Sequence, residues 1–477
     1  MNLQSATSHD EAPTPKRTRP TTGYALSLVI TGDAVDGALI SAAIAELGAE
    51  VRSSAPIDGG LEVFVACSGT AQQSEVLEML GKLSGVDSVC SSDTTFDLHV
   101  GGKIVVSPRT ALVGPDELAM AYTPGVGRVS THIAQEPSSV WRFTGRSNAV
   151  AVLSNGTAVL GLGDIGPEAA MPVMEGKAVL FKQFGGVDAY PVCVNAPTVD
   201  EVVAVGAAIA PTFGGINLED IKAPECFEIE ERLQEMLDIP IFHDDQHGTA
   251  IVVVAALLNA AKVIGRSMSE LTVTIVGTGA AGVACAHLLA EIGVGDIIGV
   301  DSRGILDSSR DGLHPSKQWF VDNGNKNNRS GGAREAIEGA DVLIGLSGPG
   351  IIEPEWIASM GDDAIVFALA NPVPEIMPEL IPDNVAVVAT GRSDYPNQIN
   401  NVLAFPGVFR GLLDVRATNA SMGVKRAAAE ALAAMVAEPT AERVIPGAFE
   451  DGVADIVARS VSAQARAEGL AREAIVG

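Results

Sequence analysis

The chain has 477 residues, of which 47% are hydrophobic and 19% are charged, so it can bury a large core and is not a disordered protein. At about 150 residues per domain, this length corresponds to roughly three domains. The formal net charge of −28 excludes a nucleic-acid partner, because phosphates bind surfaces rich in lysine and arginine. The same charge repels anions, so a site for an anionic substrate must be made locally positive by a metal ion, a few basic residues or helix N-termini.

Cysteine spacing and hydropathy place the protein in the cytoplasm. The five cysteines lie far apart, without the spacing of a disulfide framework or a zinc site, at positions 67, 90, 193, 226 and 285. The apolar runs are shorter than the ~20 residues that cross a bilayer, so no membrane contact is expected. Residues 1–22 are polar and rich in proline and threonine, which predicts a disordered tail and not a signal peptide.

Residues 23–98 form the first predicted domain, with the element order βαββαβ of a small ferredoxin-like α+β fold. The expected strands are 24–30, 50–57, 61–67 and 86–89, and the expected helices are 36–47 and 74–83. This pattern is similar to that of ACT domains, small regulatory modules that often bind amino acids at subunit contacts. The resemblance implies an effector site at the loop Thr31 to Asp33, and a dimerisation module without a ligand remains the alternative.

Residues 99–262 alternate between strands and helices, which implies parallel βαβ layers. Tyr122 precedes a turn at Pro124 that would present its ring rigidly. Strands are expected at 148–154, 190–194 and 240–242, and helices at 171–186, at 199–208 and from residue 250. A hairpin turn is expected at Asn155-Gly156, leading from the first strand into a further strand.

Lys177 is a candidate general base within the helix 171–186. Lys177 and Lys182 are five residues apart and cannot share one helical face, so one of them can enter a cleft while the other stays solvated. Its apolar neighbours predict that desolvation lowers the pKa of Lys177 towards the range useful for a base. The alternative is a lysine whose ammonium reaches solvent past an apolar helix.

Two acidic pairs, Glu219-Asp220 and Asp244-Asp245, are candidate metal ligands. The first pair follows the turn-like Gly214-Gly215, and the second lies between a short apolar strand and a helix start. Carboxylates at strand ends supply the oxygen ligands that Mg²⁺ or Mn²⁺ accepts. Solvated turn carboxylates are the alternative interpretation.

Residues 263–477 carry the fingerprint of a doubly wound dinucleotide-binding domain. A strand at 271–276 leads through a glycine-rich turn into a helix, and the next strand ends at Asp301, 19 residues after Gly282. The acid favours NAD, because it would repel a 2′-phosphate, while Arg303 leaves NADP open. The turn that would hold the pyrophosphate comprises Gly277, Thr278, Gly279, Ala280, Ala281 and Gly282.

Amide side chains follow later strands of the same domain. Strands are expected at 342–346, 365–369 and 385–389, and amides at their carboxyl ends can hold a carboxylate or a carboxamide in the cofactor crevice. The candidates are Asn371, Asn397, Asn400 and Asn401. The alanine-rich helices after Asn419 suit packing or subunit contact.

From about Gly101 onward, the chain resembles malic enzymes of the shorter bacterial kind. The strings that carry the resemblance are AYTPGVG, GLGDIGP, MEGKAVLFK, INLEDIKAPECFEIE, FHDDQHGTA, VGTGAAG, FALANPVPEI and NQINNVLAFPG. The resemblance implies a catalytic α/β domain followed by a Rossmann-like NAD-binding domain. It assigns the metal to Glu219, Asp220 and Asp245, the general acid to Tyr122, the general base to Lys177, the cofactor to the glycine turn and Asp301, and the substrate to Lys177, Asn371 and Asn401.

The implied reaction is oxidative decarboxylation of malate to pyruvate and CO₂, with reduction of NAD, in a homodimer or tetramer. Asp244 would orient the metal ligands or share in proton transfer. Larger members of the family carry an arginine before the GLGD string that this chain lacks, so Lys182 and Arg128 are candidates to bind the substrate carboxylate. The alternatives are an amino-acid or 2-hydroxy-acid dehydrogenase without decarboxylation and a non-catalytic metabolite sensor. An inhibitory effect of a chelator would favour the malic enzyme.

Overall fold

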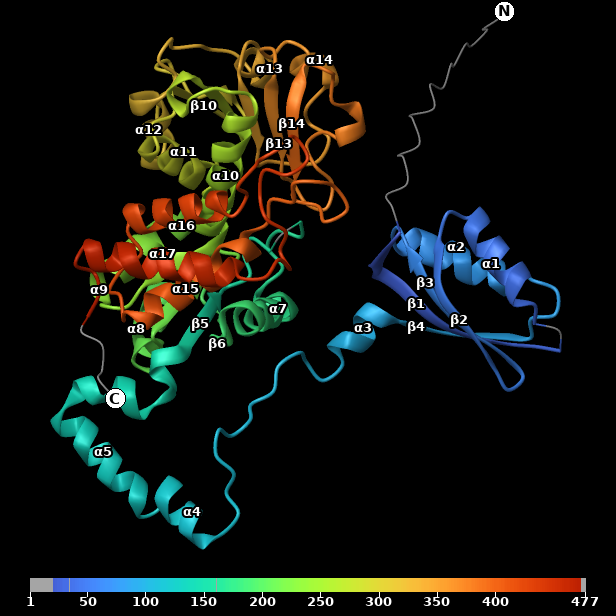
Figure 1. The fold of residues 1–477 in the computed structure, drawn as a ribbon, viewed down its shortest axis with the longest axis horizontal. Helices are drawn as coiled ribbons and strands as arrows, with labels where there is room; N and C mark the ends of the chain where they lie inside the picture. The colour runs from blue at the N-terminus through green and yellow to red at the C-terminus, as the bar shows by residue number, and fades with distance from the viewer. Residues whose placement is uncertain (1–19, 34, 160, 473–477) are drawn as a thin grey trace, which may run out of the picture. The chain divides into compact units, whose positions relative to one another are not determined.

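The computed structural model describes residues 20–33, 35–159 and 161–472. The chain divides into two compact units, Met1–Lys103 and Ile104–Gly477, each with its own core, and they are described separately (Figure 1).

The N-terminal unit is a four-stranded antiparallel sheet in the order β2-β3-β1-β4. Side chains such as Leu28, Ile44 and Val65 are fully buried in its core. Its elements are β1 (Thr21–Thr31), α1 (Gly37–Glu46), β2 (Glu50–Ile57), β3 (Gly60–Cys67), α2 (Thr70–Leu80), β4 (Ser88–Asp93) and α3 (Thr94–His99). The expected βαββαβ order is confirmed, whereas its function as an ACT-like module stays a prediction. Since β1 already begins at Thr21, the tail expected to reach residue 22 is too long by two residues, and residues 1–19 of it lie outside the described residues.

A four-stranded parallel sheet in the order β6-β5-β7-β8 forms the first half of the second unit. Its elements are β5 (Ala149–Ser154), α7 (Pro167–Gly185), β6 (Asp188–Cys193), α8 (Val199–Ile209), β7 (Gly215–Leu218), α9 (Glu225–Met236) and β8 (Ile241–His243). The alternation that the sequence predicts is therefore present as parallel βαβ layers.

Two local predictions in this half are wrong. The hairpin at Asn155-Gly156 does not form, because the amides of Ile165 and Gly166 both donate to the Gly156 carbonyl and fold the segment into a compact loop. In the described part of that loop, β structure is limited to an isolated bridge between Val159 and Gly163. Gly215 is not a turn residue either, because it opens the buried strand β7.

The second half contains a six-stranded sheet in the order β11-β10-β9-β12-β13-β14, parallel except for β11. This is the doubly wound order, in which ligands bind where the strand order reverses, here between β9 and β12. Its strands are β9 (Thr272–Val276), β10 (Asp296–Asp301), β11 (Gly304–Ile305), β12 (Val342–Gly345), β13 (Ala364–Ala368) and β14 (Val385–Thr390), and its helices are α11 (Ala280–Glu291), α12 (Pro315–Asn323), α13 (Ala333–Ile337) and α14 (Pro354–Ile357).

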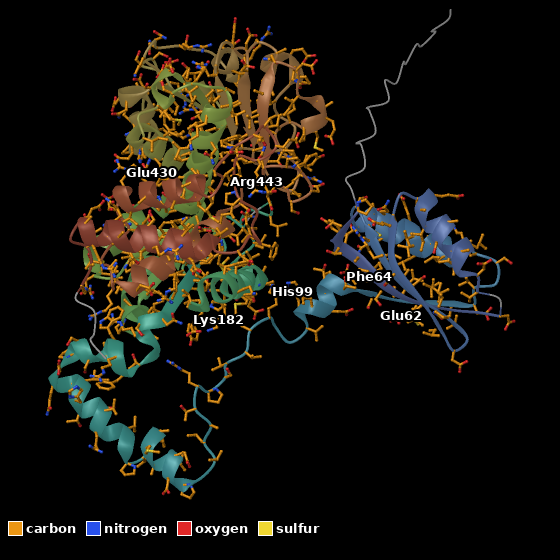
Figure 2. The ribbon with its side chains drawn as sticks, viewed as in Figure 1. Glu62, Phe64, His99, Lys182, Glu430 and Arg443 are labelled. Carbon is orange, nitrogen blue, oxygen red and sulfur yellow. The ribbon has the colours of Figure 1, made fainter. Side chains whose placement is uncertain are left out.

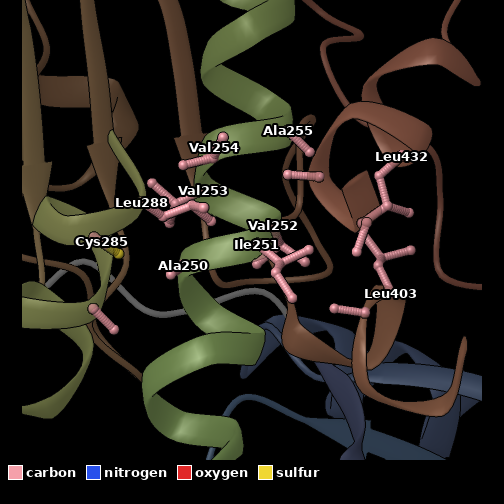
Figure 3. Packing of buried hydrophobic residues seen from close by; sticks show 14 of the residues in the cluster. Ala250, Ile251, Val252, Val253, Val254, Ala255, Cys285, Leu288, Leu403 and Leu432 are labelled. Carbon is pink, nitrogen blue, oxygen red and sulfur yellow. The ribbon is translucent and has the colours of Figure 1, made fainter. Parts of the chain in front are cut away.

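The helix α10 (Asp244–Val263) is the central core helix of the unit and begins six residues earlier than expected. Figure 3 shows its apolar side chains between Leu288 and Cys285 of α11 on one side and Leu403 and Leu432 on the other. By length and composition α10 could cross a membrane, but 72% of the apolar window is buried by the rest of the protein. Three helices complete this layer: α15 (Phe405–Asp414), α16 (Met422–Ala434) and α17 (Val453–Ala467).

The segment that precedes β5 packs little against the rest of its unit. The helices α4 (Pro115–Ala121) and α5 (Gly125–Gln135), whose ribbons are labelled in Figure 1, contain no buried residue, and the short α6 (Val140–Phe143) buries Trp141. Short 3-10 turns at Pro137–Ser139, Gly145–Asn148, Ala210–Thr212, Met268–Glu270, Pro378–Leu380 and Asn401–Leu403 connect the longer elements.

Candidate active site

Three carboxylates converge at the carboxyl ends of the neighbouring strands β7 and β8. Glu219 and Asp220 follow β7, and Asp245 lies in the first turn of α10, directly after β8. One oxygen of each side chain lies within 4.8 Å of the others. The amide of Asp220 also donates to Asp245 Oδ2 over 2.9 Å. Both residues of the first pair are buried, so their interpretation as solvated turn carboxylates is excluded.

Burial is the main cause of raised pKa values in this cluster. It raises the pKa of Glu219 to about 7, of Asp220 to about 8 and of Asp245 to about 6, and repulsion among the carboxylates adds to each shift. Asp220 Oδ2 is buried and accepts no hydrogen bond in the part of the chain that the structure describes. Converging oxygens with this negative field fit a hard divalent cation such as Mg²⁺ or Mn²⁺.

Lys177 reaches this cluster from α7. Only 8% of the residue is exposed, and its Nζ lies 2.6 Å from Asp244 Oδ2 and 2.8 Å from Glu219 Oε1. The ammonium also lies 4.3 Å from the centroid of the Phe405 ring. Lys182, labelled in Figure 2, is 64% exposed and pairs with Asp188. The expected division of the two lysines between cleft and solvent is therefore confirmed.

The pKa expected for Lys177 is wrong for this arrangement. Burial lowers the pKa of Lys177, but the charges of Asp244 and Glu219 outweigh it and raise the pKa above its ordinary value. The sequence shows the apolar neighbours within the helix, but it does not show carboxylates that arrive from β7 and α10. Lys177 therefore stands in the site as a charged ammonium with a direct hydrogen bond to a buried acid.

Asp244 links Lys177 to Asn401. The fully buried Oδ2 of Asp244 accepts from Lys177 over 2.6 Å and from Asn401 Nδ2 over 2.5 Å. Gly248 lies one helical turn after Asp244, and a Cβ there would overlap Asp244 Oδ1 and come within 3.2 Å of Asn401 Cβ. Sequence reasoning missed this role of Gly248, although its spacing of four residues from Asp244 within a helix was the available signal.

Asn371 follows β13 and is held apart from the acidic cluster. Its amide donates weakly to the Leu369 carbonyl over 3.4 Å, and Gly391 leaves the space for its side chain. The backbone carbonyl oxygen of Asn371 lies 3.4 Å from the position that a Cβ on Gly161 would take, so the GLGD loop approaches the six-stranded sheet here. Among the described residues, no hydrogen bond joins Asn371 to the carboxylates, and its substrate contact stays a prediction.

Tyr122 is not brought to Lys177 within the chain's own packing. It ends α4 with 67% of the residue exposed, and its phenol makes no hydrogen bond to any described residue. Arg128, one of the two candidates for the substrate carboxylate, is likewise exposed on α5. The structure therefore unites Lys177, Asn401 and the three acids, but neither Tyr122 nor Arg128.

The glycine turn lines a cavity of about 930 Å³ at the reversal of strand order. Gly277 has φ +109°, and a Cβ there would overlap the Leu346 carbonyl, while a Cβ on Gly282 would overlap Gly277 itself. These two glycines thus permit the tight turn that brings the α11 N-terminus to the cavity, where its amides suit a pyrophosphate. Ala223 and Pro224, which follow Asp220, line the same cavity and connect it to the acidic cluster.

Asp301 also lines this cavity, but not as an isolated charge. It accepts from Arg310 over 2.9 Å and from Lys317 over 2.7 Å. Burial would raise the pKa of Asp301, but these hydrogen bonds outweigh it and lower the pKa to about 2. Arg303 and Lys317 also line the cavity, and Arg310 pairs with Asp301, so three cations accompany this one carboxylate. The argument that Asp301 would repel a 2′-phosphate is therefore incomplete.

Comparison with known proteins gives consistent matches over the second unit. Residues 106–199 and 196–234 match the family model of the malic enzyme N-terminal domain, and residues 246–466 match that of the malic enzyme NAD-binding domain. The chain is 49% identical to the NAD-dependent malic enzyme of Geobacillus stearothermophilus over 429 residues, 90% of each chain. It is 50% identical to the bifunctional malic/malolactic enzyme of Bacillus subtilis, covering 78% of this chain and 92% of that protein. The crystal structure of malic enzyme from Pyrococcus horikoshii is 51% identical and superposes with a TM-score of 0.76 over 78% of this chain and 89% of that one.

Proposed function

Because the chain belongs to the malic enzyme family, we propose that it oxidises malate and decarboxylates the product to pyruvate and CO₂ while reducing NAD. The observation that supports this most is the convergence of Glu219, Asp220 and Asp245. The loop that carries Glu219 and Asp220 continues into the wall of the dinucleotide cavity at Ala223 and Pro224. A dehydrogenase without a metal would have no use for three converging carboxylates, two of them buried.

The acidic cluster would hold Mg²⁺ or Mn²⁺, which when bound acts as a Lewis acid on the C2 oxygen and offsets the charge that develops as CO₂ leaves. Lys177 Nζ takes the proton of the C2 hydroxyl after passing its own proton to Asp244, the buried acid that accepts its hydrogen bond over 2.6 Å. The carboxylate charges that hold the pKa of Lys177 above its ordinary value would be offset by a bound divalent cation, and burial raises the pKa of Asp244 to about 7, so both effects favour this transfer. Asn401, fixed by the same carboxylate, orients its amide for a substrate carboxylate, as Asn371 does from the end of β13.

A chelator and one variant test the metal assignment. We expect EDTA to abolish malate-dependent reduction of NAD, and excess Mn²⁺ to restore it. Asp245→Asn should weaken Mn²⁺ binding, measured from the electron paramagnetic resonance signal of the free ion. Asp188→Asn, which removes an exposed carboxylate paired with Lys182, is the matched control. Full turnover in EDTA, with release of no CO₂, would instead identify a dehydrogenase that does not decarboxylate.

The subunit arrangement follows from the exposure of Tyr122. The segment around it exposes many large apolar side chains, and an isolated soluble chain seldom leaves so many uncovered. These are Val105, Val106, Leu112, Val113, Leu118, Met120, Val126 and Val129. The chain therefore acts as a homodimer or tetramer, in which Tyr122 of one copy protonates C3 of the enolate in the site of the other.

Subunit mixing tests this arrangement. Tyr122→Phe and Lys177→Met should each be nearly inactive alone, and unfolding and refolding them together should restore activity, because hybrid dimers contain one intact site. A mixture as inactive as its components would show that each chain supplies its own tyrosine.

The N-terminal unit is the proposed effector module, and the cytoplasm is the proposed compartment. All five cysteines are free, as expected in a reducing compartment. The ferredoxin-like sheet and the loop from Thr31 to Asp33 support a small-molecule site. Activity measured across the amino acids, with and without residues 1–103, tests the module, and identical responses of both forms would remove that role.

A further inference from the structure

A second cavity, of about 380 Å³, lies among the helices α9, α10, α11 and α16. Phe227, Val283 and Met422 give it apolar walls, and Phe227 and His314 also line the dinucleotide cavity, so the two spaces adjoin. The volume falls in the range of about 300–1,000 Å³ that small-molecule sites occupy. None of the residues assigned above to metal, malate or pyrophosphate lines this second cavity.

Lys425 of α16 lines the cavity with an unpaired ammonium. Only 8% of the residue is exposed, and within the described residues its Nζ forms no hydrogen bond or ion pair. Lys177 is equally buried, but it has two carboxylate partners. Burying an unpaired charge is unfavourable unless a partner arrives or the group loses its proton. Burial accordingly lowers the pKa of Lys425, although Glu230 acts in the opposite direction.

Glu230 is already committed to other donors. Its carboxylate accepts from the His243 amide over 3.1 Å, from Gln246 over 3.3 Å and from His247 over 2.8 Å. Burial raises the pKa of Glu230, but its interactions with His247 outweigh burial and lower the pKa to about 2. The carboxylate of Glu230 is therefore already hydrogen-bonded by residues at the start of α10, and the ammonium of Lys425 remains available to a ligand.

His287 adds a second unmet polar atom to the wall. Its ring packs on Trp319 at 4.6 Å between centroids, and its Nε2 is buried without a hydrogen-bond partner among the described residues. Burial, together with His247 and Lys425, lowers the pKa of His287 to about 4, so the ring is neutral at pH 7 and can donate one hydrogen bond. One cation and one neutral donor match a single carboxylate. The exposed Glu228 and Glu231 on the wall disfavour a ligand with a second negative charge.

We propose that this cavity binds a small monocarboxylate with an apolar body, whose carboxylate lies on Lys425 and His287, as a ligand site separate from that of malate. Gln246 and His247 directly follow the proposed metal ligand Asp245 on α10, and Val283 and His287 belong to the helix that begins at the glycine turn. Occupancy therefore fixes the metal-bearing helix against the nucleotide-bearing helix. This regulatory consequence rests on the proposed function, whereas the binding site does not.

Isothermal titration of the full-length protein with sodium butanoate tests the site. We expect saturable binding at about the millimolar level, retained in the presence of Mn²⁺ and malate, and a loss of affinity of at least about tenfold in Lys425→Met. The exposed Lys326→Met is the matched control and should bind as the wild type does. Butylammonium and butan-1-ol, which have the same apolar body without the carboxylate, should not bind.

A measurement on the wild-type protein covers the case in which Lys425→Met fails to fold. Butanoate should protect Lys425, but not Lys326, from acylation by acetic anhydride, with the sites quantified by peptide mass spectrometry. Several results would overturn the proposal: no saturable binding, equal affinity in a folded Lys425→Met, no protection of Lys425, or complete displacement of butanoate by NAD or by malate. Loss of malate oxidation in EDTA tests the proposed function independently, since butanoate binding requires no metal.

Discussion

Substituting Gly248 by alanine tests whether the Lys177–Asp244 contact is essential to the reaction. The added methyl would overlap Asp244 Oδ1, and Asn401 Cβ at 3.2 Å blocks one direction of relief. To restore ordinary van der Waals contact, the carboxylate has to withdraw by roughly 1 Å or more. A shift of that size lengthens the 2.6 Å bond to Lys177 beyond hydrogen-bond distance.

The expected loss can be worked from this one contact. A hydrogen bond between charged groups contributes about 1.5–3 kcal/mol, and Lys177 retains Glu219 at 2.8 Å. At about 1.4 kcal/mol per tenfold, kcat/KM for malate should fall by roughly 10- to 100-fold. The helix itself should not suffer, because alanine is favoured over glycine in a helix interior by about 1 kcal/mol.

Steady-state kinetics with malate, NAD and Mn²⁺, together with the thermal unfolding midpoint, separates these effects. Gly145→Ala is the matched control, because a Cβ at Gly145 meets nothing within 4 Å, and it should leave kcat/KM unchanged. A Gly248→Ala enzyme with wild-type kcat/KM would refute the reasoning, since the Lys177–Asp244 bond would then contribute nothing to turnover.

Three further variants test other parts of the structure. Arg303→Ala should lower kcat/KM for NADP by about tenfold or more and leave kcat/KM for NAD almost unchanged, because Arg303 is a charged donor at the ribose end of the cavity. Equal losses of kcat/KM with NAD and NADP would contradict this role. The pKa of His287 in the folded protein is lowered to about 4 from the ordinary 6.5, so protonation favours the unfolded chain. The free energy of unfolding should therefore fall by roughly 3 kcal/mol as the pH drops from about 6.5 to 4. In His287→Gln the unfolding midpoint should depend less on pH over that range, and an unchanged pH dependence would argue against this account. Phe405→Leu removes a ring whose centroid lies 4.3 Å from Lys177 Nζ and 4.7 Å from the centroid of Phe181. The substitution should lower the free energy of unfolding in chemical denaturation by about 1–2 kcal/mol and lower kcat several-fold. A wild-type kcat would show that the ring serves packing alone.

The sequence by itself was sufficient for features whose spacing is local. The glycine turn between a strand and a helix, with Asp301 at the end of the next strand, predicts the dinucleotide crevice because every part of it lies within one βαβ unit. The pair Asp244-Asp245 was found in the same way, since a carboxylate that follows an apolar strand lies at the edge of the sheet, whereas Glu219-Asp220 was placed after an expected turn that the structure shows as the strand β7. Lys177 was predicted to enter a cleft because its helix is apolar and Lys182 cannot share its face.

Only the tertiary structure decided the charges that these groups experience. Lys177 meets Asp244 across 67 residues of sequence, and Asp244 meets Asn401 across 157, because β7 and β8 are neighbours in the sheet and α10 starts at its edge. That order turns an expected lowering of the Lys177 pKa into a raised one. The cations that surround Asp301 and the unpaired ammonium of Lys425 were likewise hidden, because burial and pairing depend on which distant segments pack together, and the spacing of residues along one element does not specify that.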